Sequence, residues 1–364
     1  MSDQVSLRTI RMKIITILGA RPQFIKAAAV SNLFRQHFDE LLVHTGQHYD
    51  SNMSDVFFEE LNIPKPAYHL NIGSGNHGAQ TGAMLTEIEK VLLAEQPDFV
   101  MVYGDTNSTI AGSLAASKLL IPVIHVEAGL RSFNKAMPEE QNRILTDHIS
   151  DLLFVPTQTA VDNLKNEGIQ KGVFNVGDVM YDGILHFTEI AKSKSTILNT
   201  LELAENDFLL CTIHRAENTN DPIRLKAICS ALTASGENIV LPLHPRTQKY
   251  IADYGIELGA NVKVIEPVGY LDMVRLESAC KKIVTDSGGV QKEAFFLAKP
   301  CITMRDETEW VETVNNGWNV IVGADEAKIK DAILNFNPTK ERLDYFGKGN
   351  AAELMVDLIK NHKK

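Results

Sequence analysis

Short apolar runs alternate with helix-length segments along this chain, and this alternation restricts the fold more than any other feature. The apolar runs of the first half are Lys13–Leu18, Glu40–His44, Asp98–Tyr103, Pro122–Val126 and Leu152–Val155. The segments of helical length between them are Phe24–His37, Gly78–Glu95, Ser108–Leu120 and Glu139–Ser150. Continuous apolar runs are typical of buried parallel strands. The order strand, helix, strand, helix therefore predicts an α/β fold with a doubly wound parallel sheet.

The same pattern starts again after Gly177, so the chain predicts two such domains. The second set of strand candidates is Phe208–Ile213, Asn238–Pro242, Val262–Ile265, Lys282–Thr285 and Cys301–Thr303. A length of 364 residues exceeds what one core usually organises. We predict Rossmann-like domains at residues 12–177 and 178–345, and a helix at 346–364 that packs back on the first domain. Ligands bind at the carboxyl ends of such strands, which predicts a central cleft faced by both domains.

The net charge and the sparse special residues exclude several classes of function. A formal charge of −10 argues against a nucleic-acid or anionic-membrane surface, because such binding needs a basic face. Without an apolar stretch of about 18 residues or a signal sequence, the chain is expected to be cytoplasmic. The cysteines lack CxxC spacing and are predicted to be buried free thiols. The histidines show no HExxH spacing, so neither a metal nor any other cofactor is expected.

Two motifs follow predicted strands of the first domain. The first, GARPQFIK (Gly19–Lys26), is not the dinucleotide fingerprint GxGxxG. Its Arg21 and Lys26 either meet an anion at a helix N-terminus or are solvated cations beside a tight turn. The second, YGDTNST (Tyr103–Thr109), contains Asp105, which is either a helix N-cap or a catalytic carboxylate.

The run HVEAGLRSFNKAMPEEQNR (125–143) carries the densest set of ionisable residues. Glu127 follows an apolar strand, where a carboxylate needs partners. Carboxylates forced close together have pKa values that are pushed apart, as paired acid and base roles require. Glu139 and Glu140 are also favourable acids for the first turn of a helix, and both interpretations can hold together. Arg131 and Arg143 are the arginines of this run.

In the second domain, histidines follow two predicted strands. His214 of CTIHRAEN stands beside an arginine, and we interpret it as a proton carrier, a phosphate contact or a structural histidine. His244 of LPLHPRT repeats the arrangement of a strand followed by cations.

The segment TDSGGVQKEA (Thr285–Ala294) joins a strand to a helix through Ser287, Gly288 and Gly289. Its backbone N–H groups and the helix dipole are suited to a diphosphate, while Glu293 is placed to accept from ribose hydroxyls. A Gly-Gly turn before a helix is also common in proteins that bind no nucleotide.

Together, six motifs resemble those of the non-hydrolysing UDP-N-acetylglucosamine 2-epimerases, in the same order and with similar spacing. They are GARPQFIK, YGDTNST, HVEAGLR, PEEQNR, HRAEN and DSGGVQKEA, and the resemblance runs from about Lys13 to Gly323. It implies the glycosyltransferase-B architecture, a UDP-sugar substrate and a homodimer. It also implies a reaction in which a base removes the C2 proton while UDP leaves C1, giving a 2-acetamidoglucal to which UDP re-adds.

The resemblance also carries roles onto matching residues. It implies a catalytic set of Asp105, Glu127, Glu139 and His214, without deciding which carboxylate is the base. The predicted substrate and UDP contacts are Arg21, Lys26, Arg143, His244, Ser287, Gly288, Gly289 and Glu293.

Some segments depart from the best-known bacterial enzymes of this family. Trp310 stands where many members have an arginine. Residues Thr45–Ser54 and Arg131–Glu140 look more like the branch that acts on UDP-2,3-diacetamido-2,3-dideoxy-glucuronate, or like archaeal-type relatives. The substrate therefore stays open between this sugar and UDP-N-acetylglucosamine.

Three other functions are alternatives to epimerisation. A glycosyltransferase of the same architecture has little use for three carboxylates around C2. A hydrolysing epimerase would lose UDP to water after the same first step. A nucleotide-sugar sensor would bind without turnover, which does not explain so many ionisable groups. The implied biological setting is polysaccharide biosynthesis.

Overall fold

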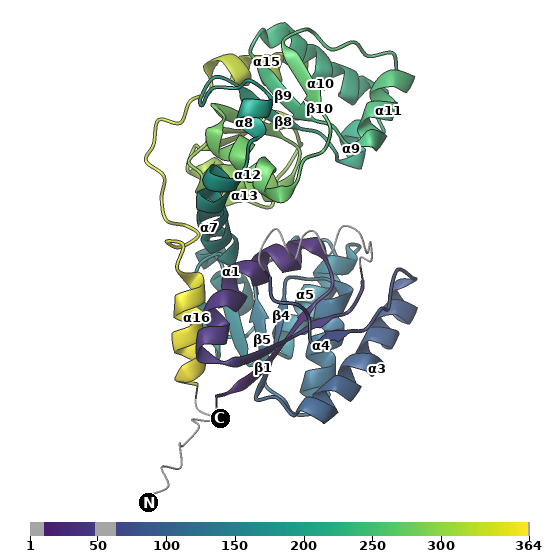
Figure 1. Ribbon diagram of the computed structural model, residues 1–364, viewed down its shortest axis with the longest axis vertical. Coiled ribbons are helices and arrows are strands. Elements are labelled where there is room, and N and C mark those ends of the chain that lie inside the picture. The colour runs from purple at the N-terminus through teal and green to yellow at the C-terminus, as the bar shows by residue number, and fades with distance from the viewer. Residues whose placement is uncertain (1–10, 48–62, 363–364) are drawn as a thin grey trace, which may run out of the picture. The chain divides into compact units, whose positions relative to one another are not determined.

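The computed structural model describes residues 11–47 and 63–362, and the chain divides into two compact units (Figure 1). The first unit comprises Met1–Gly183 and Tyr345–Lys364, and the second unit comprises Ile184–Asp344. The division falls inside helix α7 (Val179–Lys194), a few residues beyond the boundary expected from the sequence. Each unit contains one fully parallel sheet, which confirms the predicted pair of Rossmann-like α/β domains.

The sheet of the first unit has seven strands in the order β3-β2-β1-β4-β5-β6-β7. Their bounds are β1 Lys13–Leu18, β2 Asp39–His44, β3 Tyr68–His69, β4 Phe99–Tyr103, β5 Val123–Val126, β6 Leu152–Val155 and β7 Val173–Asn175. Chain order reverses between β1 and β4, and at such a switch point the strand ends leave a crevice. Because Ile17 pairs with Val102 and Tyr103 with Val126, the turns after β1, β4 and β5 open at one edge.

Seven helices flank this sheet in the part of the first unit that the structure describes. They are α1 Arg21–His37, α3 His77–Glu95, α4 Asn107–Lys118, α5 Pro138–His148, α6 Gln158–Asn166, the start of α7, and α16 Ala351–Lys360. Their first turns follow ordinary capping chemistry, since α1 and α5 have proline in their first turn and Thr106 caps α4. Figure 1 shows α16, the last helix, lying against α1, the first.

The sheet of the second unit has six strands in the order β10-β9-β8-β11-β12-β13. The strands are β8 Leu209–Thr212, β9 Ile239–Pro242, β10 Val262–Ile265, β11 Lys282–Thr285, β12 Cys301–Thr303 and β13 Asn319–Ile321. The helices are α8 Ile197–Thr200, α9 Ala216–Thr219, α10 Pro222–Ser235, α11 Pro245–Asp253, α12 Tyr270–Ala279, α13 Gly288–Phe296, α14 Val311–Asn315 and α15 Glu326–Asn335. Chain order reverses between β8 and β11, so the switch point lies between the HRAEN and DSGG segments.

All four cysteines lie buried and unpaired in the second unit. Burial raises the pKa of the Cys229 thiol to about 12, so this thiol stays protonated and packs as a small apolar group. Within residues 11–47 and 63–362, no helix has the length and apolar character needed to cross a membrane.

Candidate functional site

Two ion pairs gather acids and bases at the carboxyl edge of the first unit's sheet. Lys26 of α1 pairs with Glu127, the residue that follows β5. Arg143 of α5 pairs with Asp105, which follows β4, and also contacts Glu140 at 3.1 Å. The Lys26 and Glu127 side chains are only 11% and 9% exposed, so each charge depends on its partner. The structure therefore brings together four of the predicted site residues: Lys26, Asp105, Glu127 and Arg143.

The backbone at Glu127 is held in a conformation that side chains disfavour. Its φ is +69°, in the left-handed region that non-glycine residues seldom occupy. The Glu127 and Ala128 N–H groups both donate to the Phe154 carbonyl of β6, at 3.0 and 3.1 Å. Such a conformation costs about 1–3 kcal/mol and is concentrated at functional sites. The neighbouring strand thus imposes the position of this carboxylate against local preference.

Gln23 fixes the GARPQFIK turn to the end of β4. Its side-chain carbonyl accepts from the N–H groups of Gly19 at 2.8 Å and Ala20 at 3.0 Å. Its amide donates to the Tyr103 carbonyl at 2.8 Å. Gly19 is required by close packing, since a Cβ there would lie 2.1 Å from Ser108 Oγ. The start of helix α1, which carries Lys26, is consequently held to the turn that carries Asp105.

Asp105 does not cap α4, so the N-cap interpretation is wrong. The neighbouring Thr106 is the N-cap and accepts from the Thr109 N–H. Asp105 instead has its carboxylate on Arg143, and its carbonyl accepts from Asn142 at 2.9 Å. The Asp105 side chain remains 30% exposed, which leaves it accessible to a ligand.

The two acids that open α5 have different surroundings. Glu140 is buried and accepts from the N–H groups of Ser132 at 2.9 Å and Phe133 at 2.8 Å. Burial alone would raise the pKa of Glu140, but these donors and Arg143 lower it overall. Glu139 is exposed in the first turn of α5. Glu140 therefore holds the loop, and Glu139 is left available for chemistry.

In the second unit, a buried aspartate that the sequence analysis did not select organises the HRAEN segment. Asp286 follows β11 and accepts from the N–H groups of His214 at 3.1 Å and Arg215 at 3.0 Å, and from the Asn218 amide at 3.1 Å. Its Oδ1 lies 3.3 Å from His214 Nδ1, while half of the His214 side chain (51%) is exposed. A carboxylate placed in this way fixes the orientation of an imidazole. The sequence signal that could have identified Asp286 is its position directly after an apolar strand.

The residues of the DSGG turn present a helix N-terminus to solvent. Ser287 caps α13, its Oγ accepting from the Val290 N–H at 3.4 Å. A Cβ at Gly288 would clash with a Glu309 oxygen, whereas Gly289 is exposed and a Cβ there would meet only Ser287 Oγ, at 3.9 Å. An anion can therefore approach the backbone at Gly289 without obstruction. His244 is the exposed N-cap of α11, where its Nδ1 accepts from a backbone N–H.

Glu293 belongs to a buried acidic pair. It lies on α13 and interacts electrostatically with Tyr270 and Glu277, which stand seven residues apart on one face of α12. Burial raises the pKa of Glu293 to about 7, and burial together with the Glu293 charge raises that of Glu277 well above its usual value. Two buried carboxyl groups in contact share a proton. No motif in the sequence points to Glu277, because its helix is an ordinary amphipathic segment.

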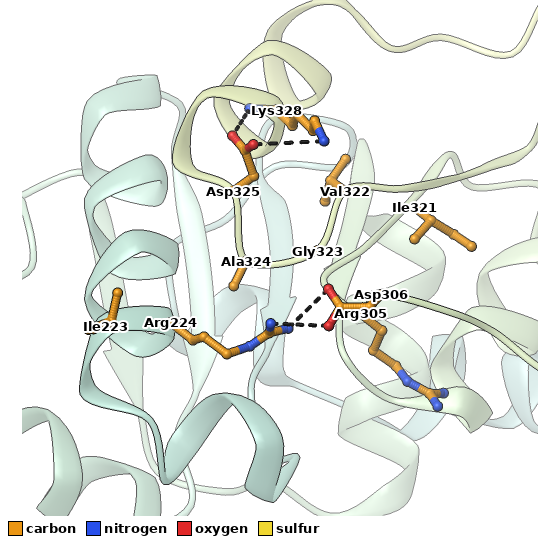
Figure 2. A pocket seen from close by; sticks show the side chains of 10 residues that line it. All are labelled: Ile223, Arg224, Arg305, Asp306, Ile321, Val322, Gly323, Ala324, Asp325 and Lys328. Atoms are coloured by element: carbon orange, nitrogen blue, oxygen red, sulfur yellow. Dashed lines mark hydrogen bonds and ion pairs between the residues drawn. The ribbon is translucent and has the colours of Figure 1, made fainter.

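A pocket of about 490 Å³ opens in the second unit, next to the loop that carries His214 (Figure 2). It is lined by Ile223, Arg224, Arg305, Asp306, Ile321, Val322, Gly323, Ala324, Asp325 and Lys328. None of the predicted site residues lines it. Arg224 pairs with Asp306 at 3.1 Å and donates to Asn218 at 3.1 Å, the residue that also bonds Asp286. The pocket therefore borders the loop that carries His214. Asp306 already neutralises the charge of Arg224 in this pocket.

Two predicted features lie outside the residues that the structure describes. The side chain of Arg21 and residues 48–62, which include part of the segment Thr45–Ser54, are not described. In the described ranges, no group of three or more His, Cys, Asp or Glu is placed to hold a metal ion.

Two Rossmann-like domains with ionisable residues gathered at both switch points define a two-domain α/β enzyme. The sequence model of one family, described as UDP-N-acetylglucosamine 2-epimerase, matches residues 32–360. A UDP-2,3-diacetamido-2,3-dideoxy-D-glucuronate 2-epimerase from Pseudomonas aeruginosa is 58% identical, covering 86% of this chain and 89% of that protein. A UDP-N-acetylglucosamine 2-epimerase from Methanocaldococcus jannaschii is 47% identical, covering 96% and 99%.

A solved structure of the Methanocaldococcus jannaschii UDP-GlcNAc 2-epimerase in complex with UDP-GlcNAc and UDP matches with a TM-score of 0.84. It is 45% identical, and the match covers 96% of this chain and all of that one. This chain belongs to the UDP-N-acetylglucosamine 2-epimerase family, and it is an isomerase.

Proposed function

We propose that this protein inverts C2 of a UDP-linked 2-acetamido sugar without net hydrolysis, with UDP-N-acetylglucosamine as the first substrate to test. The observation that carries the proposal is the set of carboxylates after β4 and β5, each held by its own cation. Three acids, Asp105, Glu127 and Glu139, provide more proton-transfer groups than nucleotide binding requires.

The chemistry requires a base and a stabilised leaving group at the same time. A C2 proton is weakly acidic, so its removal must accompany cleavage of the C1–O bond, with both bond electrons leaving on UDP. The products are UDP and a 2-acetamidoglucal with a C1–C2 double bond. Protonation of C2 from the opposite face and re-addition of the UDP oxygen to C1 complete the inversion. The first unit supplies the carboxylates for both proton transfers.

The second unit supplies the groups that hold UDP. Ser287 and the backbone at Gly288 and Gly289 meet the diphosphate at the start of α13, where N–H groups stabilise developing negative charge. Glu293 accepts from ribose hydroxyls. His214, oriented by Asp286, lies near the glycosidic oxygen or the diphosphate.

Proton NMR of the enzyme with UDP-N-acetylglucosamine in deuterium oxide tests this proposal. We expect UDP-N-acetylmannosamine carrying deuterium at C2, since the proton removed exchanges with solvent before the return step. Free UDP with free N-acetylmannosamine would show a hydrolysing enzyme instead. Epimerisation without deuterium at C2 would contradict the elimination mechanism.

A second candidate substrate has its own supporting observation. The Pseudomonas aeruginosa relative, at 58% identity, is named for UDP-2,3-diacetamido-2,3-dideoxy-D-glucuronate, against 47% for the Methanocaldococcus jannaschii enzyme. The same NMR assay with this sugar decides between them through the ratio of kcat/KM values. We expect the substrate with the higher kcat/KM to be the one that fits the loop Arg131–Glu140.

A homodimer, a cytoplasmic location and a role in polysaccharide biosynthesis belong to the same proposal. Light scattering after size-exclusion chromatography tests the first, with about twice the mass of 40.3 kDa expected.

A further inference from the structure

His125 lies at the centre of the first unit's site without touching solvent. It is on β5, two residues before Glu127, and its side chain is completely buried. Its Nδ1 lies 2.7 Å from Asp147 Oδ1, and its Nε2 lies 2.8 Å from the Gly104 carbonyl oxygen. Both ring nitrogens therefore have a hydrogen-bond partner at short distance.

Both of these partners are acceptors. A backbone carbonyl has no proton to give, so His125 Nε2 must donate to Gly104. The second oxygen of Asp147 accepts from Arg131 at 2.7 Å and from the Gly129 N–H at 3.1 Å, as a carboxylate does. A neutral imidazole carries only one N–H and would place a lone pair against a lone pair at the other contact. The geometry thus requires the doubly protonated imidazolium.

The charges around His125 are two acids and one arginine. Arg131 contacts Asp147 and also forms a two-pronged pair with Glu167, at 2.7 Å for both bonds. The Asp147 and Arg131 side chains are 0% and 1% exposed. Arg131 thus divides its charge between buried Asp147 and Glu167, which is 28% exposed, and a charged His125 completes the pairing of Asp147. His148 lies outside this cluster, partly exposed and 3.9 Å from Glu167.

The acidity of Asp147 agrees with this arrangement. Burial alone would raise the pKa of Asp147, but His125 and Arg131 lower it overall. Arg131 and the Gly129 N–H, which both donate to the second oxygen, also favour the charged form of Asp147.

The imidazolium connects the pieces of backbone that carry the proposed catalytic carboxylates. Gly104, which accepts from Nε2, directly precedes Asp105, and the Gly104 N–H donates to Val126, which directly precedes Glu127. Asp147, which accepts from Nδ1, lies one turn along α5 from Arg143, the partner of Asp105. One charged ring thus joins the turn after β4, the end of β5 and helix α5.

We propose that His125 is a positioning residue that works as a permanent imidazolium, fixing Asp105 and Glu127 for proton transfer while taking no proton itself. This inference rests on the proposed function for the roles of the two carboxylates. The protonation state of His125 is independent of that function and is measured separately.

The first experiment measures the ring nitrogens directly in the whole protein. The chain is labelled with ¹⁵N-histidine, and the His125 signals among the 11 histidines are assigned by their loss in His125→Gln. We expect both nitrogens to show bound protons at pH 7, since both face acceptors. A single protonated nitrogen at pH 7 overturns the proposal, whether or not the enzyme turns over a UDP sugar.

The second experiment separates positioning from binding. His125→Leu removes both donors, His125→Gln keeps an amide donor, and the exposed His186→Gln is the matched control. A misplacement of catalytic groups by about 1 Å costs about 100-fold in rate, so we expect kcat to fall about 100-fold in the leucine variant and less in the glutamine variant. The Kd for UDP should stay within about threefold of the parent, because the second unit binds UDP.

The outcomes separate the two proposals. A leucine variant with kcat within about threefold of the parent overturns the positioning role. If the leucine variant does not fold, the glutamine variant and the NMR result decide. A parent enzyme that epimerises neither sugar contradicts the proposed function and leaves the NMR result standing.

Discussion

The Glu127 carboxylate is the residue whose removal we expect to separate chemistry from binding. In Glu127→Gln the side chain keeps its size but loses the charge that pairs with Lys26 and the capacity to remove a proton. Proton transfer by a positioned group contributes about 10²–10⁴-fold. We therefore expect kcat to fall by about 10³-fold and the Kd for UDP, measured by calorimetry, to change by less than about threefold.

The exposed Glu353→Gln on α16 is the matched control for this substitution and should retain the parent's kcat. Near-normal turnover in Glu127→Gln would exclude Glu127 from proton transfer and leave Asp105 and Glu139 as the remaining acids.

The buried pair Glu277–Glu293 makes stability depend on pH in a direction set by the sign of its pKa shifts. Both shifts are upward, so the folded protein holds protons more tightly than the unfolded chain. This stabilisation is complete below the unfolded pKa of 4.5 and is lost as pH rises through the folded value, about 7 for Glu293. Each group contributes a slope of up to about 1.4 kcal/mol per pH unit.

We expect the free energy of unfolding of the second unit to fall between pH 5 and pH 8, and to fall less in Glu277→Gln. The amide of this variant carries no charge at any pH and can still donate to Glu293. Urea unfolding at four pH values in this range measures both slopes. Equal slopes in the parent and the variant would show that Glu277 is not protonated in the fold.

At the scale of elements, the strand–helix alternation predicted both sheets, and the structure confirms them. The strands that the sequence did not reveal are the short edge strands β3, β7 and β13, of two or three residues. A strand of that length has too few residues for any periodicity, and only its neighbour in the sheet defines it. The local sequence pattern was therefore enough to predict the central strands, and these strands position the site.

Within the site, sequence reasoning selected residues but not their partners. Asp105 and Thr106 are both good N-caps one residue apart, and only the tertiary pairing with Arg143 separates their roles. His125 and Asp147 are 22 residues apart in sequence, yet their side chains are 2.7 Å apart. Long-range contacts of this kind arise from packing β5 against α5, which no local motif records.

Helix α13 offers a test of whether its N-terminus binds the nucleotide. Ser287→Ala removes the cap, which should cost about 1 kcal/mol of stability. If Ser287 also contacts the diphosphate, the Kd for UDP should rise about tenfold, because a hydrogen bond to a charged group contributes about 1.5–3 kcal/mol.

Thr157→Ala is the matched control, since Thr157 caps α6 in the first unit in the same way. It should lose similar stability without weakening UDP. An unchanged Kd in Ser287→Ala would restrict Ser287 to capping.

At the scale of the whole molecule, the first unit is closed by the end of the chain. Helix α16 buries Met355, Val356 and Ile359 and packs against α1. Asp182 of helix α7 accepts from the first N–H groups of α16, at 3.1 Å for Ala351 and 2.8 Å for Ala352. The chain therefore leaves the first unit, builds the second, and returns to complete the first.

Because each unit has its own core, damage to α16 should destabilise the first unit alone. Ile359 is 0% exposed, so Ile359→Ala should cost about 2–5 kcal/mol. Both tryptophans of the chain, Trp310 and Trp318, belong to the second unit, so their fluorescence reports only its unfolding. Far-UV circular dichroism reports the helices of both units.

We expect Ile359→Ala to lower the denaturant midpoint of an early circular-dichroism transition and to leave the tryptophan midpoint unchanged. Leu354→Ala, on the same helix but at a position that is 40% exposed, is the control and should shift neither midpoint appreciably. Parallel shifts of both signals in Ile359→Ala would show that the two units unfold as one cooperative body. In that case the returning helix would stabilise the second unit as well, and variants of α16 would also weaken the proposed UDP binding at temperatures near unfolding.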